Sequence, residues 1–91
     1  LDPAESVEQQ VLRQEVADFL QEAITTLPPN QRIAVTLCDV EGLDYQEISD
    51  VTGWALGTVK SRLSRGRAKL REYISAQRPE LNPVRRRSTG A

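Results

Sequence analysis

Residues 44–72 read DYQEISDVTGWALGTVKSRLSRGRAKLRE, and this stretch decides the fold because it holds two helix signals with a short turn between them. The first signal is a capping box: Asp44 can cap a helix N-terminus, and Glu47, three residues on, can reach back to it. It predicts a short helix over about residues 45–52. The side chains expected on the inner side of this helix are Ile48 and Val51.

The turn and the second helix follow directly. Thr52-Gly53-Trp54 breaks the first helix. Apolar residues then recur at helical spacing, which predicts a second helix over about residues 55–76. Two helices joined by a turn of three or four residues that contains glycine are typical of a helix-turn-helix.

The second helix divides into faces when each residue is advanced by about 100°. Its apolar stripe, of the width that faces a core, holds Val59, Leu63, Gly66, Leu70, Tyr73 and Ile74. Its outer face holds Ser61, Ser64, Arg65 and Ala68. One edge of the stripe carries Lys60 and Arg67, and the other edge carries Arg62 and Lys69.

This arrangement indicates binding in the major groove of DNA, which is about 12 Å wide and admits a helix. Serine hydroxyls can meet base edges there, and Arg65 can form two hydrogen bonds with guanine. The flanking cations would face the phosphates, and Thr58 lies at the helix start, where free N–H groups attract a phosphate. The alternative is an ordinary solvated basic face. The preceding turn, the small outer residues and the lack of acidic residues from 57 to 71 favour DNA.

The rest of the chain adds two supporting helices. Apolar residues recur every three or four positions from Val7 to Leu27, which predicts a long helix over about residues 4–26 with one apolar stripe. Two prolines end it, and a second helix is expected over about 29–40, with Gly42 as its left-handed C-cap. The side chains expected on the buried side of that helix are Ile33, Ala34, Leu37, Cys38 and Val40.

The predicted fold is all-α, a small four-helix domain with a C-terminal helix-turn-helix. Residues 7–76 are expected to form this domain, residues 1–6 a linker remnant, and residues 77–91 a flexible basic tail in which Arg85, Arg86 and Arg87 could add DNA affinity. The N-terminus starts without Met, which suggests a fragment of a larger protein.

The net charge of −1 hides a division along the chain. Residues 1–51 hold eleven acidic and two basic side chains, whereas residues 52–91 hold ten basic and two acidic ones. Such asymmetry indicates a polyanionic partner for the basic half. The acidic half would then face away from that partner or bind another one.

Composition excludes several classes of protein. One cysteine, Cys38, and no histidine cannot build a zinc site or an internal disulfide, which fits a reducing cytoplasm. No apolar run approaches the roughly 20 residues that span a membrane. Four aromatic residues are too few for a base-stacking surface. Neither an enzyme nor a bound cofactor is expected, because no paired catalytic acids and no phosphate-binding loop are present.

The run LPPNQRIAVTLCDVEGLDYQEISDVTGWALGTVKSRLSRGRAKLRE at residues 27–72 resembles region 4 of bacterial sigma factors, above all the extracytoplasmic-function (ECF) group. The resemblance covers about residues 7–75. It implies recognition of the promoter minus-35 element, docking on the β-subunit flap of RNA polymerase, and regulation by an anti-sigma factor. It also implies that the domain that melts the minus-10 element lies elsewhere in the full-length factor.

Carried over residue by residue, the resemblance implies two sets of DNA contacts. The base contacts fall on Lys60, Ser61, Ser64 and Arg65. The phosphate contacts fall on Thr58, Arg62, Arg67, Tyr45 and Gln46. The sequence departs from the family pattern at Ser49, Thr52, Trp54 and Gly66, where alanine, leucine, a smaller aliphatic residue and alanine are usual. Trp54 is expected to cap the core, and Gly66 to allow close helix approach.

Two alternatives remain open at this point. One is the output domain of a response regulator, which shares a GTVK-like stretch but lacks the basic run that follows it here. The other is a helical protein-interaction module whose basic face meets an acidic partner.

Overall fold

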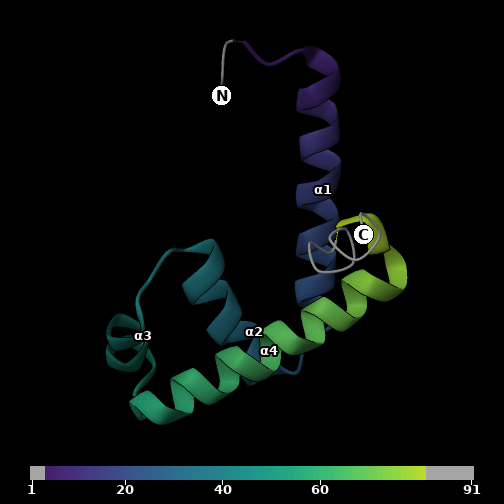
Figure 1. The fold of residues 1–91 in the computed structure, drawn as a ribbon. Helices are drawn as coiled ribbons and strands as arrows, with labels where there is room; N and C mark the ends of the chain where they lie inside the picture. The colour runs from purple at the N-terminus through teal and green to yellow at the C-terminus, as the bar shows by residue number, and fades with distance from the viewer. Residues whose placement is uncertain (1–3, 82–91) are drawn as a thin grey trace, which may run out of the picture.

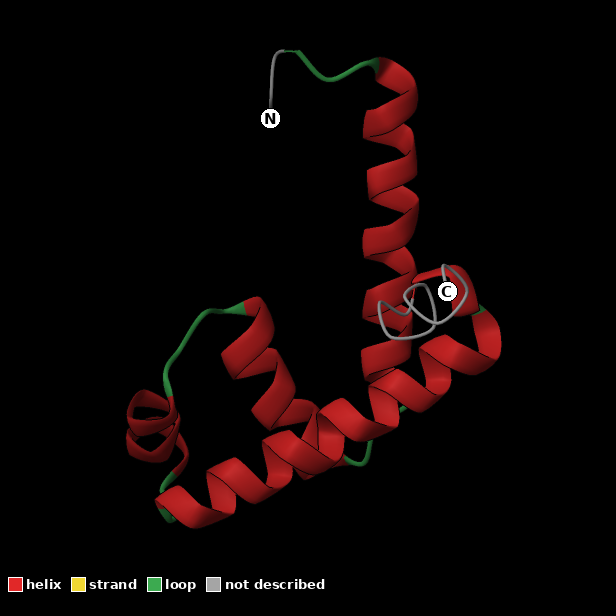
Figure 2. Cartoon of the chain, viewed as in Figure 1, coloured by secondary structure: helices red, strands yellow, loops and turns green. Residues whose placement is uncertain are grey.

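The computed structural model describes residues 4–81, and every regular element within them is helical. The elements in chain order are α1 (Val7–Thr25), α2 (Pro29–Val35), η1 (Thr36–Val40), α3 (Tyr45–Thr52), α4 (Leu56–Gln77) and η2 (Pro79–Leu81). Figure 1 shows α4 as the long helix against which the others are arranged, with α3 at its N-terminal end. Figure 2 shows the same arrangement without a strand in the described part of the chain, so the predicted all-α class is confirmed.

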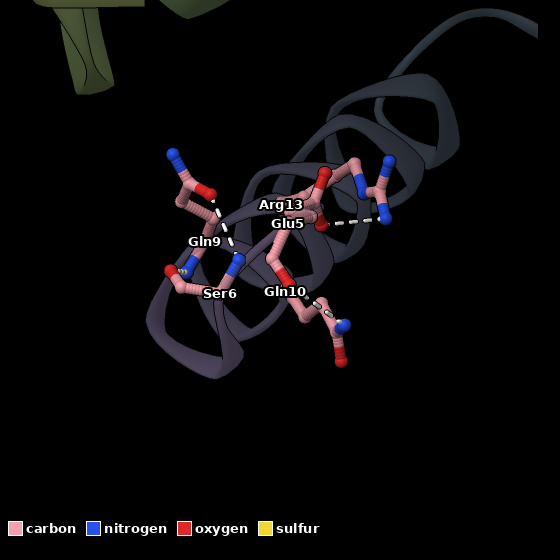
Figure 3. A network of polar contacts seen from close by, with 5 residues as sticks. All are labelled: Glu5, Ser6, Gln9, Gln10 and Arg13. Atoms are coloured by element: carbon pink, nitrogen blue, oxygen red, sulfur yellow. Dashed lines mark hydrogen bonds and ion pairs between the residues drawn. The ribbon is translucent and has the colours of Figure 1, made fainter. Parts of the chain in front are cut away.

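α1 begins three residues later than predicted because Ser6 caps it. Ser6 Oγ accepts a hydrogen bond from the Gln9 N–H at 3.1 Å, and Gln9 Oε1 accepts one from the Ser6 N–H at 2.9 Å. Figure 3 shows this capping box beside the 2.7 Å ion pair between Arg13 and Glu5. Sequence analysis missed the box, although serine followed three residues later by glutamine is its signal.

The apolar stripe predicted along α1 is buried only near the end of the helix. Ala23 and Leu27 are buried, whereas Val7 is 74% exposed and Val11 is 53% exposed. The first turns stay exposed because α1 meets α2 and α4 only near its C-terminal end, and its first half rises clear of both in Figure 1. Helical periodicity identifies an apolar face but not how far a neighbour covers it.

The helix predicted over 29–40 is present, but its last turn is wider than an α-helix. η1 is a π-helical turn in which the Glu41 N–H donates to the Thr36 carbonyl at 2.9 Å. Gly42 follows with φ of 79°, which confirms the left-handed position. The expected burial of Ile33 and Val40 is wrong, since these side chains are 43% and 47% exposed.

The core lies where α2 crosses α4. It is built from Leu27, Ala34, Val35 and Leu63, with Ile24, Cys38, Trp54 and Leu70 packed against it. Gly66 lets the two helices approach closely, as expected. A Cβ atom on it would lie 2.8 Å from Val35 Cγ2 and 3.3 Å from the Gln31 carbonyl oxygen. Any residue larger than glycine at position 66 would therefore require α2 or α4 to move.

The C-terminal end of α4 is joined to α1 by aromatic contacts. The rings of Phe19 and Tyr73 stack with centroids 5.8 Å apart, and the Arg78 guanidinium lies 5.5 Å from the Phe19 ring centroid. The tail predicted from residue 77 therefore begins within ordered structure, including η2. Its arginines at 85–87 lie outside the described residues. Among residues 4–81, no helix is both long and apolar enough to cross a membrane.

Candidate nucleic-acid interface

The first helix of the predicted helix-turn-helix is capped at both ends. Asp44 Oδ1 accepts a hydrogen bond from the Glu47 N–H at 2.8 Å, and Glu47 Oε1 accepts one from the Asp44 N–H at 3.0 Å. Gly53 ends α3 with φ of 78°, a conformation that glycine adopts without strain. The predicted capping box and the break are both confirmed. Ile48 is fully buried, but Val51 is 67% exposed, so the inward placement of Val51 is wrong.

Three hydroxyl hydrogen bonds shape the turn between α3 and α4. Ser49 Oγ donates to the Trp54 carbonyl at 2.6 Å. Thr52 Oγ1 donates to the Ile48 carbonyl at 2.7 Å and accepts from the Trp54 N–H at 3.1 Å. Ser49 and Thr52, which depart from the family pattern, thus bond the carbonyl and the N–H of Trp54, backbone groups that lie outside both helices. They fix the direction in which α4 leaves the turn.

α4 lies on the core as the helical wheel predicts. Val59 and Leu63 are buried together with Gly66, and Leu70, Tyr73 and Ile74 are half-buried. The four predicted base-contacting residues are all exposed: Ser61, Ser64 and Arg65 on the other side of the helix, and Lys60 at its edge. Ala68 was expected at the centre of that face but is half-buried.

The predicted phosphate-contacting residues fall into two groups. Tyr45 and Gln46 are exposed at the start of α3, and together with Asp44, Leu56 and Lys60 they line a hollow between α3 and α4. Gln46 is oriented by Asp50, to which its side-chain amide donates at 3.0 Å. Thr58, Arg62 and Arg67 are half-buried, and the two arginines are engaged within the protein.

Arg62 lies over the aromatic ring of Trp54, with its guanidinium carbon 4.3 Å from the ring centroid. A guanidinium over an indole face is attracted by the electron-rich ring. Trp54 packs on the core, as expected, and its half-buried ring holds Arg62 at one edge of α4.

Arg67 is bound to Asp39, 28 residues earlier in the chain. Its Nε donates to Asp39 Oδ2 at 3.0 Å and its Nη2 donates to Asp39 Oδ1 at 2.6 Å, a two-point contact between α4 and η1. The same Nη2 lies 3.4 Å from the Cys38 sulfur. The hydrogen bonds that Arg67 donates to the Asp39 carboxylate raise the pKa of Arg67 above its ordinary value. Two of its three guanidinium nitrogens therefore face the protein, which sequence reasoning did not reveal.

A second hollow follows the edge of α4 that carries Lys60 and Arg67. It is lined by Tyr45, Lys60, Leu63, Ser64, Arg67 and Arg71. Sequence reasoning missed Arg71 here. The signal was present, because Arg71 lies three turns beyond Lys60 on the same side of the helix.

The geometry defines a class of protein before any comparison is made. Two helices meet across a capped glycine turn, and the second exposes cations and hydroxyls on the face opposite the core. That is the architecture of a helix-turn-helix domain that places its second helix in the major groove.

Comparison with known proteins specifies the family. The family model described as "Sigma-70, region 4" matches residues 20–70, which is more than half of the chain, so the chain belongs to this family. The family consists of transcription factors and not of enzymes. Its match covers α3, the turn and α4 as far as Leu70, and it gives no support to the response-regulator alternative.

Three relatives agree with this assignment. The chain is 52% identical over 61 residues to the ECF RNA polymerase sigma factor SigE of Mycolicibacterium smegmatis, covering 67% of this chain and 24% of that protein. It is 40% identical over 67 residues to the RNA polymerase sigma-H factor of Pseudomonas aeruginosa, covering 74% of this chain and 35% of that protein. It is 31% identical over 74 residues to the ECF RNA polymerase sigma-E factor of Haemophilus influenzae, covering 81% of this chain and 39% of that protein. The chain therefore spans well under half the length of these relatives.

Proposed function

We propose that this chain is a promoter-binding domain that reads the minus-35 element through α4 and docks on RNA polymerase during transcription initiation. The observation that carries the proposal is the exposed surface formed by Lys60, Ser61, Ser64 and Arg65 on a helix held against the core by Val59 and Leu63. Because the turn before α4 is fixed by hydroxyl hydrogen bonds, this surface is presented in one orientation.

In this proposal the four exposed residues read bases and their neighbours bind phosphates. Lys60 and Arg65 donate to guanine, and the hydroxyls of Ser61 and Ser64 accept or donate at base edges. Arg62 and Thr58 contact one backbone, whereas Tyr45 and Gln46 contact the other. Hydrogen bonds to phosphates set the register of the helix, and those to bases set the sequence preference.

The test is a selection experiment followed by a binding measurement. The 91-residue chain is used to enrich duplexes from a random-sequence library, and the enriched duplex is compared with a scrambled one of the same composition at two salt concentrations. Specific binding should persist as salt rises, while scrambled binding falls steeply. Failure to enrich any sequence, with equal affinity for both duplexes, would contradict sequence reading by α4.

The polymerase contact is proposed for a different face. An apolar groove lies between α1, η1 and α4, lined mainly by Ala17, Leu20, Ile24, Val35, Val40 and Leu70. Leu70 belongs to the apolar stripe of α4, on the side opposite Ser61 and Ser64, so polymerase and DNA could bind together. The β-subunit flap is the partner that the family implies for such a site.

A pair of variants on α1 tests this contact. Leu20→Asp adds a charge in the groove, whereas Val7→Asp adds the same charge on the part of α1 that stands clear of α4; the two side chains are 38% and 74% exposed. Binding to a purified β-flap fragment should fall for the first variant and stay unchanged for the second. Equal binding by both variants would place the flap elsewhere.

The proposal also covers the binding unit, its regulation and its location. Residues 7–76 act as the binding unit within a longer sigma factor. An anti-sigma factor is the proposed regulatory partner, supported by the acidic charge of residues 1–51. Action on DNA together with RNA polymerase implies the cytoplasm as its location.

A further inference from the structure

We infer that Arg71 binds a DNA phosphate at the edge of α4, and that Arg67 is a positioning residue that joins α4 to η1. The inference rests on the proposed DNA function and changes the roles that sequence reasoning gives to this edge. It assigns a phosphate contact to Arg71, for which no contact was predicted, and removes one from Arg67.

The first step is the line of residues along α4. Lys60, Ser64, Arg67 and Arg71 follow each other at spacings of four, three and four positions. Residues at these spacings lie on one side of a helix, and the eleven residues from first to last span roughly 16 Å. All four line the same hollow, which Tyr45 of α3 closes from the other side. The hollow therefore presents hydroxyls and cations together, the donors that phosphate binding uses.

The second step is the difference between the two arginines. Arg67 makes a two-point contact with Asp39 at 2.6 and 3.0 Å, so a carboxylate already neutralises its charge. Arg71 is exposed, and within residues 4–81 neither Arg71 nor Lys60 forms an ion pair. A DNA backbone that follows this edge of α4 would meet a cation at each end, Lys60 and Arg71, neither of which is paired within the described residues. Between them it would meet Arg67, whose charge is already neutralised by Asp39.

Binding a DNA phosphate releases counterions from the DNA. Each such contact therefore steepens the plot of the logarithm of the binding constant against the logarithm of the salt concentration by about 0.9. An arginine that keeps its carboxylate partner adds little net positive charge for this effect. Arg71 should carry the salt dependence, and Arg67 should carry the attachment of α4 to η1.

The experiment compares alanine variants of the 91-residue chain on a scrambled duplex and on the duplex enriched from a random library. Arg71→Ala should weaken both by a similar factor, roughly eightfold at 0.1 M salt, and flatten the salt slope by about 0.9. Arg71→Lys should restore the slope. Arg67→Ala should lower the thermal midpoint but leave the slope unchanged, and Arg71→Ala should leave the midpoint unchanged.

Arg32→Ala is the matched control, because it removes the same charge from an exposed side chain on α2 that forms no ion pair within residues 4–81. It should change neither slope nor midpoint appreciably. An unchanged slope for Arg71→Ala, or an equal flattening by Arg67→Ala, would overturn the division of roles. Arg65→Ala tests the proposed function separately. If this variant keeps the preference for the enriched duplex, base reading by Arg65 is contradicted. The phosphate contact of Arg71 is still tested independently, by binding to the scrambled duplex.

Discussion

The guanidinium of Arg62 lies 4.3 Å from the centroid of the Trp54 ring, so the turn of the helix-turn-helix directly positions a cation on α4. The Trp54 backbone is itself held at both ends: Ser49 Oγ donates to its carbonyl, and its N–H donates to Thr52 Oγ1. A residue that sequence reasoning treats as a core cap therefore has a second effect, on the edge of the DNA-facing helix.

The Arg62–Trp54 pair should be energetically coupled. A double-mutant cycle with Arg62→Ala and Trp54→Leu, which removes the aromatic ring, is expected to give a coupling of about 0.5–1 kcal/mol in chemical denaturation, the range for partly exposed cation–π pairs. Trp54 is the only tryptophan, so its fluorescence should change in Arg62→Ala without unfolding. Strictly additive effects of the two substitutions would show that the stacking contributes nothing.

Arg65→Ala should relax base preference and retain the fold. Arg65 is exposed and points away from the buried stripe, so its removal leaves the core intact. The loss of discrimination between the enriched duplex and its best single-base variants should be about 1–3 kcal/mol, measured by competition binding. Arg62→Ala is the comparison, since it should weaken all duplexes alike and flatten the salt slope by about one. The same loss for every duplex with Arg65→Ala would show a phosphate contact instead.

Gly66→Ala should destabilise the domain even though alanine favours helices. The helix-propensity gain is up to about 1 kcal/mol. The added Cβ would lie 2.8 Å from Val35 Cγ2 and would force α2 and α4 apart, at a cost of about 1–3 kcal/mol. Chemical denaturation should show net destabilisation that Val35→Ala partly relieves, because it removes the clashing methyl group. A more stable Gly66→Ala variant would mean that the helices separate readily.

Asp39→Asn should lower stability by up to about 1 kcal/mol, since the ion pair with Arg67 is partly exposed. Added salt should shrink this difference between the variant and the natural chain. Asp39 raises the pKa of Arg67, so the stabilisation from the Arg67 charge is present below the ordinary arginine pKa and is lost only in strong alkali. Arg67 should therefore add no pH dependence from about pH 5 to about pH 9. A difference that grows with salt would contradict the electrostatic origin.

Local chemistry accounts for the parts that could be predicted. The capping box of Asp44 and Glu47 depends on residues three positions apart, and the left-handed turns at Gly42 and Gly53 depend on single residues. The buried stripe of α4 follows from its own period of 3.6 residues. These features are short in range, and the sequence by itself determined them together with the four exposed residues Lys60, Ser61, Ser64 and Arg65.

Tertiary structure alone decided which faces are covered and which cations are free. Val51 and the first turns of α1 carry apolar side chains that no neighbour buries within the described residues. Arg67 and Arg71 are alike in the sequence, but of the two only Arg67 meets a carboxylate within residues 4–81, supplied by η1 from 28 residues away. Periodicity assigns a side chain to a face of its own helix. The partner on that face comes from the packing of α2 against α4, in which Gly66 permits the close approach.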